Sequence, residues 1–476
     1  MKKYNYIIVG LFFAACLTVS SCKTPQTSLK DNTKKLPESF GNTTDTISSA
    51  TINWKTFYSD TYLVKLIDTA LVNNYDVLIS LQKIKAAQSD VLFSKGAMFP
   101  TVSGVSNAGA RRFGLYTMDG AGNATTDITP GKLIPINLPD YLVGLQTSWE
   151  VDVFGKLKNQ KKAAFSRVLS SEAMKNVVTT NLIAEIANSY YELIATDQSI
   201  SIVDKNIAIQ ENALEKVIVM KEAAVTNELA VKQFKAQLLN IKAMKVELQQ
   251  QITEIENKIN FLIGSYPQKI ERQTSFTASN LPREIQFGVP SALLQNRPDI
   301  KMAEFELIAS KSDVKSAKAQ FYPNLVITGG IGYQAFKPDL LFNPQSVVFN
   351  LLGGLTAPLL NRSAIKASFN KANAYQIEAL YSYQSTILNA YLEVNTEMVR
   401  ITNLKEILKL KTEETQELNN SIEIASDLFK YGRANYLEVL TVQQNALEAE
   451  LDLIETQKQQ FQTTVNVYKA LGGGWD

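Results

Sequence analysis

Residues 71–100 read LVNNYDVLISLQKIKAAQSDVLFSKGAMFP, and residues 294–323 read LQNRPDIKMAEFELIASKSDVKSAKAQFYP. The two stretches align without a gap at an offset of 223. Nine aligned positions are identical, whereas ordinary residue usage gives about two. A second block repeats at an offset of 208, with eight identities between 227–264 and 435–472. We therefore expect the chain to contain the same structural plan twice, in two equivalent halves.

Long helices are predicted in both halves from apolar residues that recur every seven positions. One series covers 380–429 with an interruption at Thr415, and its counterpart covers 186–214. Shorter series in the segments that follow cover 234–262 and 440–468. A sustained seven-residue repeat keeps one apolar stripe against a partner when the helices form a left-handed coiled coil.

The longest of these helices are predicted over stretches that contain no proline, at about 156–222 and about 363–430. At 1.5 Å per residue, each would be roughly 100 Å long. A compact globular domain of this size does not need so long a helix. The pattern therefore predicts paired helical rods, and a plain antiparallel coiled-coil stalk is an alternative at this point.

The sequence changes period directly after the matched Pro100 and Pro323. Two strands are predicted in each half, as one hairpin at about 100–154, with a loop at roughly 117–140, and a second hairpin at about 323–358. The return strand of the first hairpin alternates apolar and polar residues, as transmembrane β-strands do. Four strands are too few to close a barrel around a pore, and hydrocarbon does not tolerate unpaired strand edges. The hairpins are therefore either soluble or part of a barrel that several chains share.

The N-terminus has the layout of a secretory signal. Lys2 and Lys3 precede an apolar run at 7–17 that is too short to span a bilayer. Small residues then lead to Ser21 and Cys22, which resembles a bacterial lipoprotein processing site. That resemblance implies cleavage between Ser21 and Cys22 and a covalent lipid on Cys22 that anchors the chain in a membrane. An ordinary secretory signal with an incidental cysteine is the alternative.

Composition excludes several classes of function. The 476 residues contain no histidine, so imidazole ligands and histidine-based catalytic triads are excluded. Cys22 is the only cysteine after the signal, so we expect no internal disulfide, no cysteine metal site and no cofactor besides the lipid.

Charge and hydropathy narrow the choice further. The chain has 48 basic and 46 acidic residues, and removal of the two signal lysines leaves 46 of each, so no nucleic-acid partner is expected. We find no glycine-rich phosphate loop. After the signal there is no run of about 18 apolar residues, so a membrane crossing would have to use strands.

Four local motifs resemble TolC/OprM-like outer membrane factors, and the resemblance covers essentially the whole mature chain. In the Arg-Pro-Asp motif, Pro298 suits a first helical turn and Asp299 suits the positive end of a helix, so we expect a capping role there. The motifs are at 149–155, 294–300, 321–325 and 431–440.

The resemblance implies an internally duplicated, mixed α/β membrane protein. Three chains would form a homotrimer in which each gives four strands to one 12-stranded transmembrane β-barrel, with the helices forming a coiled-coil tunnel through the periplasm. The implied segments are a signal peptide at 1–21, a lipid-anchored linker at 22–57, a first repeat at 58–264, an equatorial linker at 265–288, a second repeat at 289–472 and a tail at 473–476.

The implied function is that of a passive exit duct in the outer membrane, which is not an enzyme. Its implied partners are outer-membrane lipid, a periplasmic adaptor protein and an inner-membrane pump, often of the RND type, which supplies the energy. Nothing in the sequence resembles an ATPase or a proton relay.

The candidate functional site implied by the resemblance is the periplasmic entrance, where each long helix turns back. Gly432 would permit a tight turn. Glu438 matches a position where some relatives place an acid facing the entrance, and threefold symmetry would make a ring of three carboxylates there. A solvated surface acid is the alternative, and a second acid of some relatives is replaced by Ala434. The candidate entrance residues are Asn227, Glu228, Tyr431, Gly432, Arg433 and Glu438.

Two other classes remain open from the residues alone. A lipid-anchored periplasmic coiled-coil adaptor or scaffold would share the seven-residue repeats, but it does not need amphipathic strands between the copies. A lipid-anchored enzyme would need a compact set of catalytic groups, and we find none.

Overall fold

The computed structural model describes residues 35–41, 47–276, 285–357 and 362–475. The predicted processing site at Ser21 and Cys22 lies outside these ranges. The chain divides into two compact units of interleaved sequence. The strand unit contains Ala86–Val168 and Glu306–Leu380, and the helix unit contains the described parts of Asn32–Lys85, Leu169–Phe305 and Tyr381–Asp476.

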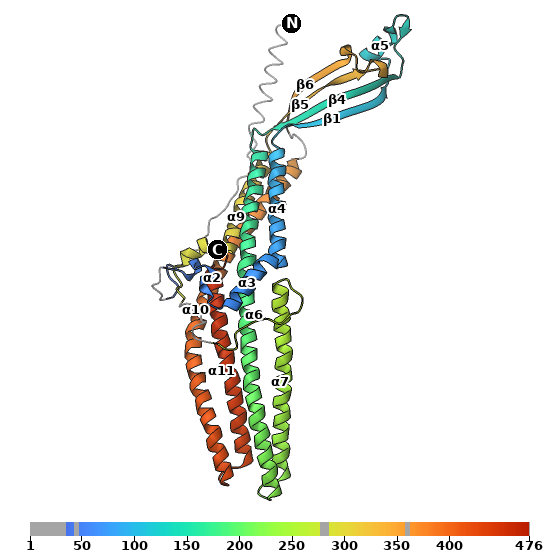
Figure 1. Ribbon diagram of the computed structural model, residues 1–476. Coiled ribbons are helices and arrows are strands. Elements are labelled where there is room, and N and C mark those ends of the chain that lie inside the picture. The colour runs from blue at the N-terminus through green and yellow to red at the C-terminus, as the bar shows by residue number, and fades with distance from the viewer. Residues whose placement is uncertain (1–34, 42–46, 277–284, 358–361, 476) are drawn as a thin grey trace. The chain divides into compact units, whose positions relative to one another are not determined.

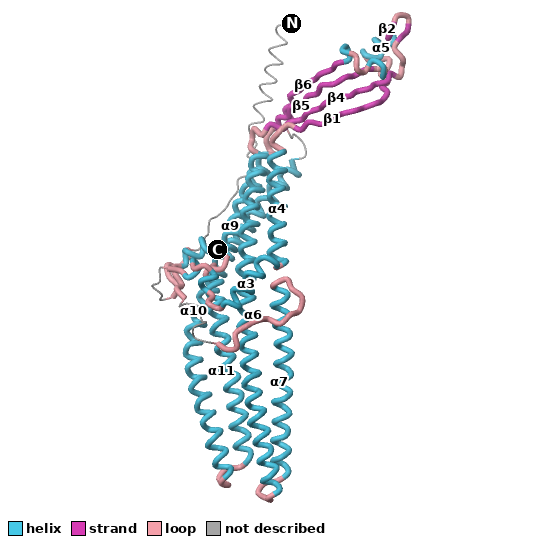
Figure 2. The backbone as a smooth tube through the Cα atoms, in the orientation of Figure 1, coloured by secondary structure: helices cyan, strands magenta, loops and turns pink. Residues whose placement is uncertain are grey.

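One antiparallel four-stranded sheet forms most of the strand unit (Figures 1 and 2). Its strands are β1 (Thr101–Arg111), β4 (Leu138–Val151), β5 (Asn324–Ala335) and β6 (Val347–Thr356), in the order β1-β4-β5-β6. The two predicted hairpins are therefore confirmed. They join through β4 and β5, which pair from Tyr141 opposite Ala335 to Val151 opposite Leu325.

The register of the sheet separates its side chains into two different faces. Residues opposite one another in a ladder lie on the same face, and successive residues alternate between faces. The four aromatic residues of the four strands all lie on one face, here called the aromatic face: Tyr141, Trp149, Tyr333 and Phe349. The three charged residues of the strands all lie on the opposite, polar face: Arg111, Asp140 and Glu150.

The connection between β1 and β4 was predicted as a loop at roughly 117–140, and this is wrong in part. It contains a short helix, α5 (Met118–Thr125), and a two-stranded ribbon of β2 (Asp127–Thr129) and β3 (Lys132–Leu133). The hydroxyl of Thr117 accepts a hydrogen bond from Gly120 N at 3.1 Å and caps α5. These few local bonds organise residues whose composition alone indicates irregular structure.

The long helices of both halves lie where they were predicted. In the first half α3 (Thr61–Asn73) and α4 (Tyr75–Gly96) precede the strands, and α6 (Lys156–Glu222) and α7 (Glu228–Leu262) follow them. In the second half α8 (Leu293–Asn296) and α9 (Pro298–Ala319) precede the strands, and α10 (Arg362–Lys430) and α11 (Tyr436–Ala470) follow. None of the helices in the described ranges is both long enough and apolar enough to cross a membrane.

In the helix unit, α6 pairs with α7 and α10 pairs with α11 (Figure 1). The largest apolar cluster joins α3, α6, α7 and α11, and within it the rings of Phe57 and Tyr468 stack with centroids 3.9 Å apart. Thr415, which interrupts the seven-residue series, is buried, and its hydroxyl lies 2.7 Å from Lys411 O and 3.2 Å from Ala449 O on the neighbouring helix α11. The polar interruption is thus compatible with a buried helix contact.

The two linkers predicted at 22–57 and 265–288 contact each other within the helix unit. Ser49 N donates to Gln286 O at 2.8 Å, and Gln286 N donates to the Ser49 hydroxyl at 2.8 Å. The Arg-Pro-Asp motif also lies in this unit, with Pro298 as the first residue of α9. Asp299 lies in the first turn of α9, as expected, and both its oxygens accept hydrogen bonds from Arg297, at 3.0 and 2.7 Å.

Candidate functional site

The two helix turns of the helix unit have the same backbone design. After α6, Ala224 has a φ of 57°, and Val225 N donates to Met220 O at 2.9 Å. After α10, Gly432 has a φ of 71°, and Arg433 N donates to Leu428 O at 2.8 Å. A left-handed residue followed by a hydrogen bond back into the last helical turn is the Schellman ending of a helix. Corresponding residues of the two turns are 208 positions apart, so the duplication extends to these turns.

The left-handed position explains why Gly432 suits its turn. Glycine adopts a positive φ without a steric penalty, whereas alanine there costs about 1–2 kcal/mol. The first turn has alanine at the equivalent position, Ala224, so its backbone is strained where that of the second turn is not.

Each return helix begins at an asparagine that caps it. The side-chain oxygen of Asn227 accepts from Ala230 N at 3.1 Å. That of Asn435 accepts from Leu437 N at 2.9 Å and Glu438 N at 3.0 Å. These bonds satisfy amide groups that the first turn of a helix otherwise leaves without partners.

In the first turn, one glutamate forms ion pairs with two lysines. Glu228 lies 2.8 Å from Lys221 and 3.3 Å from Lys232. Hydrogen bonds from Lys221 and then Lys232 lower the pKa of Glu228, and the same contact raises the pKa of Lys221. Because all three groups are exposed, the pairs fix the shape of the turn more than they stabilise the fold.

The second turn is more open. Glu438 is exposed, and its carboxylate accepts from Asn435 Nδ2 at 2.8 Å. Tyr431 is 72% exposed, with the ammonium of Lys430 at 5.7 Å from its ring centroid. Arg433 is also exposed. This turn therefore presents an acid, a base and an aromatic ring to whatever approaches it.

The structure brings the six predicted entrance residues to one end of the helix unit. Directly behind the turns, Val217 of α6, Phe234 of α7 and Leu440 of α11 form one apolar cluster, with Phe429 of α10 packed against it. The two turns therefore lie side by side, as Figure 1 shows. Within the described part of the chain, no three His, Cys, Asp or Glu side chains are grouped as metal ligands.

Two further residues contribute to this site: Lys221, which was not predicted, and Asn435, which lies in the motif at 431–440 but was not predicted as an entrance residue. The Asn435 cap had a signal, because Asn followed three positions later by Glu is the pattern of a capping box. No sequence signal indicated the role of Lys221, because its partner Glu228 lies across a turn whose geometry the residue types do not specify.

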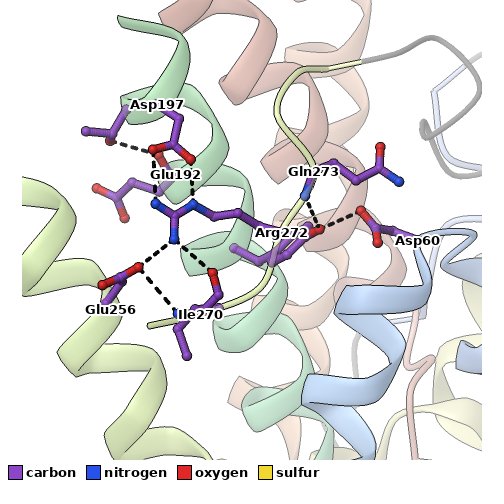
Figure 3. Close-up of polar contacts among 9 residues, drawn as sticks. Asp60, Glu192, Asp197, Glu256, Ile270, Arg272 and Gln273 are labelled. Carbon is purple, nitrogen blue, oxygen red and sulfur yellow. Dashed lines mark hydrogen bonds and ion pairs between the residues drawn. The ribbon is translucent and has the colours of Figure 1, made fainter. Parts of the chain in front are cut away.

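A group of ion pairs joins α6 to α7 at a point distant from the turns in sequence (Figure 3). Arg272, in the segment after α7, contacts Asp197 of α6 at 2.5 and 3.0 Å and Glu256 of α7 at 2.5 Å. Its side chain is 10% exposed. Burial lowers the pKa of Arg272, but the hydrogen bonds that its guanidinium donates to Asp197 and Glu256 outweigh this and raise the pKa. We refer to Arg272, Asp197 and Glu256 as the clasp.

The residue next to the clasp extends the network to α3. Gln273 N donates to the Tyr190 hydroxyl at 3.3 Å, and that hydroxyl donates to Asp60 at 2.7 Å (Figure 3). Burial and the bond to Asp60 raise the pKa of Tyr190. Three residues further on, the ring of Phe276 stacks on Phe461 of α11 at 4.7 Å. The segment 265–276 thus crosses and fixes four helices.

Fold and site together define a class: a duplicated protein whose paired long helices end in polar turns and whose strands form one amphipathic sheet. The family model of the outer membrane efflux protein matches residues 66–265 and 289–473. This chain belongs to the outer membrane efflux protein family.

Individual relatives agree with this assignment. The cation efflux system protein CusC of Escherichia coli O6:H1 is 25% identical, over 89% of this chain and 88% of its own length. The solvent efflux pump outer membrane protein SrpC of Pseudomonas putida is 26% identical, over 90% of this chain and 89% of its own length. The CmeC outer membrane channel of Campylobacter jejuni superimposes with a TM-score of 0.82 at 21% identity, covering 95% of each chain.

The predicted function and location are therefore confirmed at the level of the family. The chain is an outer-membrane efflux protein that acts as an exit duct from the periplasm. The alternative of a periplasmic coiled-coil adaptor or scaffold is replaced by this assignment.

Proposed function

We propose that three copies of this chain close one 12-stranded barrel in the outer membrane and serve as a passive conduit that catalyses no reaction. The observation that carries the proposal is the sheet, with its aromatic residues on one face and its charges on the other. The strands have 10 to 14 residues, and about 9–11 tilted residues suffice to cross a bilayer. The aromatic face would contact lipid, and the polar face would line the lumen.

The open edges of the sheet argue for several copies. Among the described residues, the outer edges of β1 and β6 pair with no other strand. Such edges are not tolerated in hydrocarbon, so β6 of one copy would pair with β1 of the next. With an even number of strands per chain, every pair around the ring stays antiparallel. Two copies would make eight strands, whose interior side chains fill, whereas three copies leave room for a lumen.

An exposed apolar surface on α10, in the helix unit, also supports contact with a neighbouring copy. Exposed apolar side chains on α10 recur at spacings of seven, four, seven and eleven residues, which places them on one helix face. A contiguous apolar stripe of this kind is rarely left in water. Its members, with their exposed fractions, are Tyr381 (64%), Leu388 (50%), Leu392 (49%), Val399 (48%) and Leu410 (54%).

The turns would be the docking end. Relatives such as SrpC are outer-membrane parts of efflux pumps. We propose that this chain likewise works with a periplasmic adaptor and an inner-membrane pump of the RND type. The exposed Tyr431, Arg433 and Glu438 of the second turn would meet the adaptor or line the entrance, where three copies of Glu438 would form a ring.

A lipid on Cys22 would add an anchor beside the barrel. Replacement of Cys22 with alanine should abolish metabolic labelling with palmitate. Cys16→Ala, which changes the other cysteine, is the matched control and should leave the labelling intact. Labelling that survives Cys22→Ala would refute the anchor.

Conductance tests the duct itself. Purified protein in planar bilayers should give discrete openings, and on gels it should migrate as trimers that heating dissociates. A protein that binds membranes but never conducts, and that always migrates as a single chain, would contradict the proposal.

A further inference from the structure

The four strands carry only three charged residues, and each has an opposite charge beside it. Near one end of the sheet, Arg111 of β1 forms an ion pair with Asp140 of β4. Near the other end, Glu150 of β4 forms one with Lys156, at 2.8 and 3.1 Å. Arg111, Asp140 and Glu150 lie on the polar face, whereas Lys156 is the first residue of α6.

A third residue fixes the first of these pairs. Gln334 Nε2, on β5, donates to Asp140 Oδ1 at 2.7 Å, while Arg111 contacts the other oxygen of the same carboxylate. The Asp140 side chain is 22% exposed and that of Arg111 is 56% exposed. Asp140 is thus held between two neighbouring strands, and the guanidinium remains open on one side.

The pair lies beside the loops that join the strands. Arg111 is the last residue of β1, Asp140 is the third of β4 and Gln334 is the last but one of β5. Asp140 and Glu150 are ten residues apart in the strand, which is about 33 Å. The loops at 112–137 and 336–346 contain three basic and three acidic residues, so they add no net charge. These are Arg112, Lys132, Lys337, Asp119, Asp127 and Asp339.

We propose that the Arg111–Asp140 pair controls the charge preference of the outer end of the duct. The inference rests on the proposed function, because the polar face meets the permeating solute only if the sheet closes into a barrel. Three copies place three pairs in a ring on the lumen wall. While each guanidinium is neutralised by Asp140, the ring passes cations and anions with little discrimination. Loss of one partner leaves three like charges at one level, and rings of like charge select ions in narrow pores.

The test is the reversal potential of the purified full-length protein in a planar bilayer under a potassium chloride gradient. Asp140→Asn keeps the acceptor for Gln334 and leaves Arg111 unpaired, so the permeability ratio of K⁺ to Cl⁻ should fall at least about threefold. Arg111→Gln should raise that ratio, and the double variant should return close to wild type. Arg111→Gln also tests the proposal if Asp140→Asn does not assemble.

Asp127→Asn is the matched control, because it removes the same charge from the loop between β1 and β4. Asp127 accepts from Gly131 N at 2.9 Å and lies in β2, outside the four-stranded sheet. It should leave the ratio unchanged. An unchanged ratio in both pair variants, or an equal change in Asp127→Asn, would overturn the proposal. Absence of conductance in wild type would instead contradict the duct.

Discussion

The side-chain amide of Asn74 donates to the carbonyl oxygen of Leu262 at 2.9 Å and joins the start of α4 to the end of α7. The same contact recurs in the second half, where Arg297 Nη1 donates to Ala470 O at 2.9 Å. The donors are 223 positions apart and the acceptors 208, which are the two offsets of the sequence repeat. The duplication thus retains a tertiary contact even where an amide is replaced by a guanidinium.

A pair of glycines beside these contacts gives the first prediction. Gly264 and Gly472 are left-handed, and an added Cβ would lie 2.7 Å from Asn73 O and 2.6 Å from the carbonyl carbon of Asn296, respectively. Alanine at either site should lower the free energy of unfolding by at least about 2 kcal/mol, through the backbone strain and the backbone clash together. Thermal unfolding followed by circular dichroism in detergent measures this.

Gly432→Ala is the matched control for the glycine prediction. Gly432 is also left-handed, but an added Cβ would meet nothing within 4 Å. Gly432→Ala should therefore cost only the backbone strain of about 1–2 kcal/mol, which is less than the loss at Gly264 or Gly472. Equal losses at Gly432 and Gly264 would show that the close approach of the two chain segments is unimportant.

The clasp gives the second prediction. Arg272→Ala leaves Asp197 and Glu256 together without their cation, so we expect a loss of about 2–3 kcal/mol in unfolding free energy. Adding Asp197→Asn and Glu256→Gln should recover part of that loss. Hydrogen exchange should also accelerate in α6 and α7 around the clasp.

A surface ion pair serves as the control for the clasp. Lys245 contacts Asp204 at 2.7 Å, with both side chains at least a third exposed. Lys245→Ala should cost no more than about 0.5 kcal/mol. If Arg272→Ala lowers the free energy of unfolding no more than Lys245→Ala does, the clasp does not stabilise the helix pair. The same conclusion follows if adding Asp197→Asn and Glu256→Gln to Arg272→Ala recovers no stability.

Glu397 on α10 gives a pH-dependent prediction. Burial raises its pKa, although Arg400 at 3.1 Å opposes this. A carboxyl whose pKa is raised on folding favours the fold below its unfolded pKa, and this contribution is lost as the pH rises through the folded pKa. Glu397→Gln should therefore raise the melting temperature at pH 7.5, and the gain should vanish near pH 4. Glu406 is exposed, so Glu406→Gln should leave the melting temperature unchanged at both pH values. A higher melting temperature of Glu397→Gln that persists near pH 4 would contradict a raised pKa of Glu397.

The entrance gives the last of the mutational predictions. Glu438→Gln retains an acceptor for Asn435, so trimer assembly should be unaffected. If three Glu438 carboxylates face the entrance, their loss should raise the half-blocking concentration of a multivalent cation by at least about threefold. Bilayer recordings measure this, with Glu222→Gln in the other turn as the control. An identical block would leave Glu438 with only its capping role.

Much of the fold could be predicted because the apolar residues recur with the periods typical of coiled-coil helices and of β-strands. The seven-residue series and the absence of proline predicted α6 and α10, which the structure confirms as Lys156–Glu222 and Arg362–Lys430. Alternation after Pro100 and Pro323 predicted the strands. The sequence repeat predicted that the two turns would be equivalent, and the turns have the same hydrogen bond from the residue after the left-handed position back to the last helical turn.

The rest depends on contacts between residues far apart in the chain. Arg272 is one basic residue in a polar segment, and its role follows only from Asp197, 75 positions away, and Glu256. The pairing of Arg111 with Asp140 likewise requires the register of β1 on β4. Helix α5 forms in a segment rich in Gly, Asn and Thr, where a single cap at Thr117 has more influence than the composition.

Cross-linking across the edges of the sheet tests the shared barrel most directly. Cysteines would be placed at Ser103 of β1 and, in turn, at Val348, Asn350 or Leu352 of β6, and treated in membranes with a bismaleimide of about 8 Å reach. Within one chain these edges are three strand spacings apart, about 14 Å, which is beyond that reach. If three chains share one barrel, the cross-linked products should end at three chains, and neither cysteine alone should give any product. Monomers only, or products longer than three chains, would contradict it.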